Sequence, residues 1–173
     1  QVGVAYALSA ADWIFPTYRD SALLIAHGTP MVSILQYFGG DERGSISPRG
    51  VNHFPISIPV GTQGLHAVGA AMAATIQKKK FAAVACLGDG ASSEGDMNEA
   101  MNFAGGFRSP VIFLCQNNQY AISIPVKMQT AAETIAQRAI GFGFDGIRVD
   151  GNDVLAVYSA TAAALKKASS GGG

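Results

Sequence analysis

Charged residues are scarce in this chain. Of its 173 residues, 12 are Lys or Arg and 12 are Asp or Glu, so 14% are charged and the formal net charge is zero. This balance argues against a nucleic-acid partner, because proteins that bind the phosphate backbone usually carry a basic excess. The apolar share of 49% excludes a disordered chain. So few charges leave an isolated monomer with a poorly covered surface, which favours a large permanent interface.

Long hydrophobic runs and cysteine pairs are also missing. The longest apolar stretches, residues 81–87 and 111–115, are far shorter than the about 20 residues of a membrane-spanning helix. The two cysteines, Cys86 and Cys115, both lie inside apolar runs, so neither a disulfide framework nor a zinc site is expected. No signal peptide is visible, and we expect a cytoplasmic protein, or a mitochondrial-matrix protein if the source is eukaryotic.

The two ends of the sequence indicate a piece of a longer subunit. The chain opens at Gln1 without a Met, inside a segment predicted to be a helix over residues 1–8. Residues 169–173, Ser-Ser-Gly-Gly-Gly, close it without a predicted ordered element. We therefore expect residues 1–173 to form a single domain that is an incomplete part of a longer protein.

Hydrophobic periodicity predicts that strands and helices alternate along the chain. We expect buried strands at residues 81–87, 111–116 and 146–149. We expect helices at residues 63–77, 94–104, 131–140 and 153–167. The third begins at a capping box of Thr130 and Glu133, and Asn152 caps the last. Residues 38–60, rich in Gly and Pro, predict a long functional loop. The alternation indicates an α/β fold with a doubly wound, mostly parallel sheet.

Polar residues follow the first two predicted strands. Gly88-Asp89-Gly90 comes after the first strand, and Asn117-Asn118 comes after the second. If Cys86 lies opposite Cys115, Asp89 and Asn118 lie side by side at the carboxyl edge of the sheet. Oxygen ligands of this kind suit Mg²⁺ that also holds a phosphate, and the following helix presents free N–H groups to an anion. The pattern predicts a site for a metal-bound diphosphate.

Other interpretations of this segment remain open. A nicotinamide-binding oxidoreductase domain would carry a glycine fingerprint, but Ser93 stands at its third position. The second strand also ends in Gln116-Asn117, without the acidic residue that binds the ribose in such domains. A third interpretation is a non-catalytic scaffold subunit that kept the fold. Intact Asp89 and Asn118 argue against it, since a purely structural copy needs no metal ligands. Separately, Gly88-Asp89-Gly90 taken alone could be only a turn.

Several motifs together resemble one enzyme family. The Gly-Asp-Gly and Asn-Asn pair resembles the motif of thiamine diphosphate enzymes. The wider resemblance is to the α subunit of the 2-oxo acid dehydrogenase decarboxylating component. It rests on Tyr18-Arg19-Asp20, ISIPVGTQ (56–63), GASSEGD (90–96), NQYAISIP (118–125) and RVDGNDVLAVY (148–158). The resemblance implies the thiamine diphosphate-binding fold.

The resemblance also assigns parts of the cofactor to particular residues. Asp89 and Asn118 would bind Mg²⁺ through their side chains, and Tyr120 would bind it through its backbone carbonyl. The other expected contacts are Tyr18 and Arg19 at the diphosphate, backbone N–H groups of Gly90 and Ala91 beside it, and Ile58 and Val60 at the aminopyrimidine ring. No catalytic residue is assigned within this chain, although His53 could line the substrate channel.

The implied activity needs a partner. The family's α subunit works with a β subunit in an α2β2 heterotetramer, oxidatively decarboxylates a small 2-oxo acid, and passes the acyl group to the lipoyl arm of an acyltransferase component. The activating Glu is expected from the β subunit, and the active-site His lies beyond this chain. Branched-chain substrates are favoured, because GASSEGD and RVDGNDVLAVY are more similar to the branched-chain enzymes. Pyruvate dehydrogenase and acetoin dehydrogenase α subunits remain alternatives.

Overall fold

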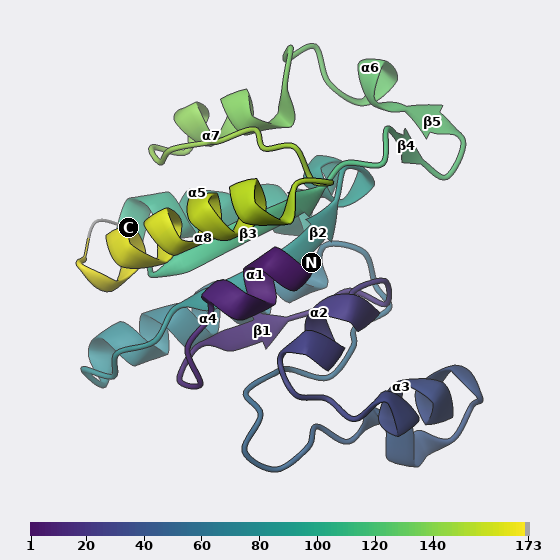
Figure 1. Ribbon diagram of the computed structural model, residues 1–173. Coiled ribbons are helices and arrows are strands. Elements are labelled where there is room, and N and C mark those ends of the chain that lie inside the picture. The colour runs from purple at the N-terminus through teal and green to yellow at the C-terminus, as the bar shows by residue number, and fades with distance from the viewer. Residues whose placement is uncertain (172–173) are drawn as a thin grey trace.

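A short parallel sheet forms the centre of the protein (Figure 1). The computed structural model describes residues 1–171. Its sheet has the strand order β1 (Trp13–Phe15), β2 (Ala83–Gly88) and β3 (Val111–Gln116). Both pairings are parallel, with β2 in the middle. All three strands therefore end at the same edge of the sheet.

Helices and short turns make up most of the remaining chain. The α-helices are α1 (Val2–Ala7), α2 (Ser21–Ala26), α3 (Met31–Phe38), α4 (Thr62–Ile76), α5 (Gly95–Phe107), α6 (Val126–Gln129), α7 (Arg138–Gly141) and α8 (Val154–Ser169). The 3₁₀ turns are η1 (Glu42–Ser45), η2 (Gly90–Ser93) and η3 (Ile135–Gln137). A small antiparallel hairpin pairs β4 (Tyr120–Ala121) with β5 (Ile124–Pro125).

Helices cover both faces of the sheet, as the doubly wound prediction requires. On one face, α1 and α2 pack with side chains of α8 against Ile14, Val84 and Cys86 (Figure 1). On the other face, Ala67 and Ala71 of α4 pack against β1 and β2, and α5 lies beside α4. Small residues meet small residues there, so α4 approaches the sheet closely. The predicted fold class is confirmed.

The predicted strand at residues 146–149 is wrong. This segment has no strand partner within the described part of the chain. This segment and β3 both line a cleft of about 1590 Å³, and Ile147 is 64% exposed. A strand requires a hydrogen-bonded neighbour as well as an apolar pattern, and within residues 1–171 no strand pairs with this segment.

The predicted helix at residues 131–140 is wrong in its first four residues, and its remainder is divided between η3 and α7. The hydroxyl of Thr130 accepts a hydrogen bond from the backbone N–H of Ala132, two residues on, which makes a local turn and does not cap a helix. The capping box forms instead at Thr134 and Gln137, which start η3. Only the short helix α7 follows.

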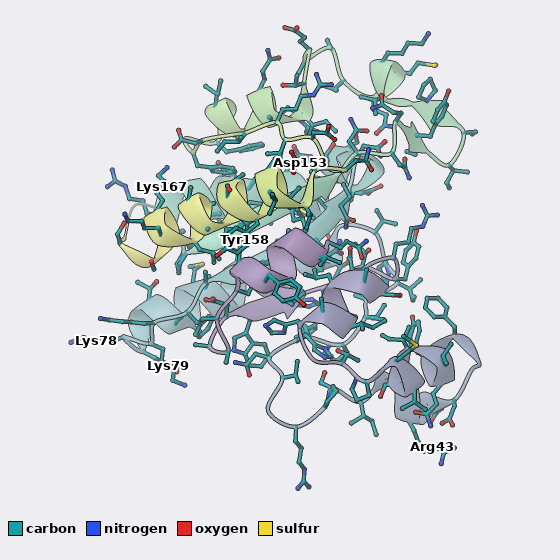
Figure 2. The ribbon with its side chains drawn as sticks, in the orientation of Figure 1. Arg43, Lys78, Lys79, Asp153, Tyr158 and Lys167 are labelled. Carbon is teal, nitrogen blue, oxygen red and sulfur yellow. The ribbon has the colours of Figure 1, made fainter. Side chains whose placement is uncertain are left out.

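Helix α8 has a different N-cap from the predicted one. Asp153, not Asn152, accepts hydrogen bonds from the backbone N–H groups of Leu155 (2.9 Å) and Ala156 (3.0 Å). A carboxylate is favoured here because it also faces the positive end of the helix dipole. Asp153 and Lys167 mark the two ends of α8 (Figure 2). Ser169 still belongs to α8, so the predicted unordered end begins later, and residues 172–173 lie outside the described residues.

The predicted loop at residues 38–60 contains η1 but otherwise has little regular structure. It borders the sheet at one point, where Ile14 donates to the carbonyl of Asn52 and accepts from the N–H of Phe54. These bonds cover the outer edge of β1. Within residues 1–171, no helix is both long enough and apolar enough to cross a membrane.

Candidate functional site

The ends of the three strands bring the predicted site segments to one edge of the sheet. Tyr18-Arg19 follows β1, Asp89-Gly90 follows β2, and Asn117-Asn118 follows β3. The loops after β2 and β3 are in close contact, because a Cβ added to Gly90 would lie 2.7 Å from the Cβ of Ala121. Strand β1 was not predicted, so the structure adds the first of these segments to the edge.

The predicted register between β2 and β3 is wrong by one residue. Cys86 lies opposite Leu114, and Leu87 lies opposite Cys115. The reason is that the two thiols belong to opposite faces of the sheet: Cys86 packs toward α1, whereas Cys115 packs with Leu87 toward α5. Because Gly88 pairs with Gln116, Asp89 corresponds in register to Asn117, and Asn118 lies one residue further along the chain.

Asp89 is buried, and only one of its two carboxylate oxygens accepts a hydrogen bond among residues 1–171. It is 2% exposed, and its Oδ2 accepts a hydrogen bond of 2.9 Å from the Nε2 of Gln129. Among residues 1–171, its Oδ1 accepts none, and the buried Oε1 of Gln129 beside it has no hydrogen-bond partner. Burial, and then the nearby Asp89 charge, raise the pKa of the Cys115 thiol to about 12. Gln129 was not predicted, since a contact across 40 residues leaves no local signal.

Side-chain hydrogen bonds hold the η2 turn that follows Asp89. The hydroxyl of Ser92 donates to the carbonyl of Asp89 (2.6 Å). Arg138 then donates to the Ser92 carbonyl (2.6 Å) and to the Oδ1 of Asn98 (2.7 Å). Arg138 was also missed by sequence reasoning, because it lies in a segment predicted to be a plain helix. This clamp keeps the N–H groups of Gly90 and Ala91 in a defined place.

The segment after β3 reverses direction through two side-chain turns. The Oδ1 of Asn117 accepts from the N–H of Gln119 (2.8 Å), and the Oδ1 of Asn118 accepts from the N–H of Tyr120 (3.0 Å). Gln119 takes a positive φ of 77° in this turn. Tyr120 then starts the β4–β5 hairpin and is 57% exposed. Asn118 and the Tyr120 backbone thus lie on the exposed side of the edge.

Tyr18 and Arg19 lie on the surface beside these turns. The guanidinium carbon of Arg19 is 5.5 Å from the centre of the Tyr18 ring, which is within the range of a cation–π contact. Arg19 makes no salt bridge within the described residues, so its charge is free for an anion. Guanidinium groups suit phosphate oxygens because they offer two hydrogen bonds in one plane.

The predicted ring-binding residues are exposed apolar side chains. Ile58 is 58% exposed and Val60 is 50% exposed. Gly61, at φ 91°, joins them to α4, and a Cβ added there would lie 3.0 Å from the Cβ of Glu94. This segment therefore lies next to the end of η2. Neither side chain belongs to the core.

His53 lies in a buried environment and is hydrogen-bonded. It is 8% exposed, its Nε2 is 2.9 Å from the Oγ1 of Thr29, and its Nδ1 is 3.5 Å from the Oγ of Ser47. Burial lowers the pKa of its imidazole. Both ring nitrogens have partners, and a role in a substrate channel stays a prediction.

The edge has the donor chemistry that a metal-bound diphosphate needs. The carboxylate of Asp89, the amide oxygen of Asn118 and the carbonyl of Tyr120 are oxygen ligands of the type that Mg²⁺ prefers. The close approach of Gly90 to Ala121 leaves no room for a side chain in the turn. The residues present therefore fit the cofactor that the sequence resemblance implies.

Fold and edge together define an α/β domain of the thiamine diphosphate-binding class. The chain belongs to the dehydrogenase E1 component family, whose profile matches residues 1–173. This family is thiamine diphosphate-dependent. The resemblance seen in the sequence is confirmed at this level.

Named relatives come from two substrate groups. The chain is 50% identical, over all 173 residues, to the 3-methyl-2-oxobutanoate dehydrogenase subunit alpha of Mycobacterium tuberculosis. It is 44% identical over the same residues to the pyruvate dehydrogenase E1 component subunit alpha of Bacillus cereus, and likewise to that of Bacillus subtilis. In each case it covers 47% of the relative, so the chain spans about half the length of these proteins.

Proposed function

We propose that this chain is the cofactor-binding part of the α subunit of a thiamine diphosphate-dependent 2-oxo acid dehydrogenase. The whole protein would decarboxylate a 2-oxo acid oxidatively and transfer the acyl group to the lipoyl arm of an acyltransferase component. The single observation that carries this proposal is the convergence of three parallel strand ends, which brings Arg19, Asp89 and Asn118 to one edge.

Each residue at this edge has a proposed task. Asp89 and Asn118, with the carbonyl of Tyr120, would hold Mg²⁺. Arg19 and Tyr18 would bind the diphosphate, aided by the N–H groups of Gly90 and Ala91. Exposed Ile58 and Val60 would contact the aminopyrimidine ring, for which an apolar surface is suitable. When bound, thiamine diphosphate would supply the electron sink for the electron pair of the carbon–carbon bond that breaks as CO2 leaves.

A β subunit is the proposed partner, in an α2β2 assembly. Exposed apolar side chains are numerous for a chain with so few charges, and Met31, Leu35 and Phe38 on α3 are each more than 60% exposed. Such surfaces are typical of permanent interfaces. The activating Glu and the lipoyl acyltransferase contact would come from outside this chain, and the assembly would work in the cytoplasm or the mitochondrial matrix.

A branched-chain 2-oxo acid is the preferred substrate, and pyruvate is the second candidate. The 3-methyl-2-oxobutanoate dehydrogenase relative is 50% identical and the pyruvate dehydrogenase relatives are 44% identical, so the margin supports only a preference. Turnover of the full-length α/β assembly should be compared on 3-methyl-2-oxobutanoate and pyruvate. A strong preference for pyruvate would overturn the branched-chain assignment while leaving the cofactor site intact.

The cofactor site itself is tested by replacing Asp89. In the full-length assembly, Asp89→Ala should abolish Mg²⁺-dependent binding of thiamine diphosphate, measured by calorimetric titration, because a buried metal-ligating carboxylate is lost. Asp96→Ala, an exposed acidic residue in the first turn of α5, is the matched control and should bind as the unsubstituted protein does. Unchanged cofactor affinity in Asp89→Ala would refute the metal assignment.

A further inference from the structure

A partly buried hydrogen-bond network spans the sheet edge next to Arg19. Asp20 is fully buried, and its Oδ2 accepts hydrogen bonds from the N–H and the hydroxyl of Thr17, both at 2.7 Å. Its other oxygen accepts a hydrogen bond from the Nε2 of Gln116. Asp20 follows β1 and Gln116 ends β3, so this bond crosses over the end of β2, which lies between them.

Gln116 is held at both ends of its amide. While its Nε2 donates to Asp20, its Oε1 accepts from the Nε2 of Gln1 (2.8 Å). The same Gln1 nitrogen also donates to the backbone carbonyl of Arg19 (2.9 Å). The Arg19 backbone is thus tied to β3 along two routes, one through its neighbour Asp20 and one through Gln1.

Asp20, at the centre of this network, is not accessible to a ligand, whereas Gln1 and Gln116 are half-buried. Asp20 has no exposed surface, and the amide of Gln116 already has a partner on each atom. Below them, burial and then the Asp20 charge raise the pKa of the Cys86 thiol, which keeps it protonated beside the carboxylate. A buried carboxylate is costly unless it is hydrogen-bonded, and here three donors satisfy it.

We propose that Asp20 and Gln116 are positioning residues that fix Arg19 relative to Asn117 and Asn118, and thereby set the affinity for the diphosphate. The inference rests on the proposed function, in which Arg19 binds the diphosphate. A preorganised guanidinium binds more tightly than a mobile one, because less conformational entropy is lost on binding. In this proposal the network fixes the Arg19 backbone, and the contact with the Tyr18 ring then orients the guanidinium.

This dependence on Arg19 can be measured in the full-length α/β assembly. Gln116→Met keeps the length of the side chain and removes both hydrogen bonds. We expect it to weaken Mg²⁺–thiamine diphosphate binding about tenfold in calorimetric titration. A tenfold change in Kd lies within the range of interaction free energies usually measured between groups of one hydrogen-bond network. In an Arg19→Ala background the same change should alter the affinity less than about twofold, because the group it acts through is gone. Gln77→Met, on the exposed C-cap of α4, is the control and should change neither.

The alternative outcomes separate the two proposals. Equal losses in both backgrounds, or no loss from Gln116→Met, would overturn the positioning role while leaving the cofactor site standing. An unsubstituted assembly that does not bind thiamine diphosphate would overturn the proposed function, and the positioning role with it. If Gln116→Met does not fold, Asp20→Asn replaces it in the same comparison, because it keeps the volume and removes the buried charge.

Discussion

The contact between Gly90 and Ala121 makes a sharp test of the site geometry. An added Cβ at Gly90 would lie 2.7 Å from the Cβ of Ala121 and 3.4 Å from its Cα. Carbon atoms prefer separations of about 3.5–4.0 Å, so one of the two segments must retreat by roughly 1 Å. Overpacking of this kind usually costs about 1–3 kcal/mol. Ala121 belongs to a two-residue strand in a small hairpin, so the hairpin is the part that should move.

Movement of this hairpin would carry Asn118 and Tyr120 away from Asp89. We therefore expect Gly90→Ala to lower the free energy of unfolding by only about 1 kcal/mol, the lower end of that range, in urea titrations. Its Kd for Mg²⁺–thiamine diphosphate should rise at least about tenfold, because a displacement near 1 Å at a binding centre is severe. Both are measured in the full-length assembly.

A compensating substitution decides whether this reasoning is correct. Ala121→Gly removes the methyl group that the new side chain would meet, so Gly90→Ala/Ala121→Gly should recover most of the affinity. Gly95→Ala is the control, since within the described residues its added Cβ would meet nothing within 4 Å beyond its chain neighbours and its own helix backbone. Wild-type affinity in Gly90→Ala, or a double variant no better than the single one, would refute the clash as the cause.

Three further outcomes follow from the contacts of the site and the core. Gln129→Met removes the amide that holds Oδ2 of Asp89, so Mg²⁺ affinity at saturating thiamine diphosphate should fall about tenfold or more; an unchanged titration would contradict it. Arg138→Met breaks the clamp on Ser92 and Asn98 and should lower the urea unfolding free energy by about 1.5–3 kcal/mol, whereas exposed Lys127→Met should not. Burial lowers the pKa of His53, so its contribution to stability is present above the unfolded value of about 6.5 and is lost as the pH falls through the folded value. The loss of unfolding free energy from pH 7 to pH 5 should be smaller in His53→Gln, and an equal loss would show that His53 is not responsible.

Two strands and the helices packed on them could be predicted because their signal is local. Residues 81–87 and 111–116 form continuous apolar runs, and the structure places β2 and β3 within a residue or two of them. Strand β1 could not be predicted in the same way. Trp13–Phe15 is three residues long, too short for a periodicity to show, and it is a strand only because β2 lies beside it.

The errors have the same origin. Residues 146–149 have an apolar pattern but no neighbouring strand among residues 1–171. Residues 131–140 have helical spacing but stronger local turns at Thr130 and Thr134. A strand depends on a partner that a single sequence does not identify, and a helix start depends on which of two nearby caps forms. In both cases the local pattern is present in the sequence, but the structure depends on other contacts: the missing strand partner in the first and the turns at Thr130 and Thr134 in the second.

The residues of the candidate site also differ in whether a local sequence signal identifies them. Asp89 and Asn118 could be proposed from sequence because each follows a strand whose end is visible in the hydrophobic pattern. Gln116, Gln129 and Arg138 could not, since each acts on a residue 40 or more positions away. A glutamine carries no charge and is common on any surface, so nothing in the chain distinguishes the two that hold carboxylates from the others. The roles of these three residues depend on contacts between distant parts of the chain. Paired substitutions, such as Gln116 with Arg19 and Gly90 with Ala121, are therefore needed to distinguish an effect on the cofactor site from an effect on fold stability.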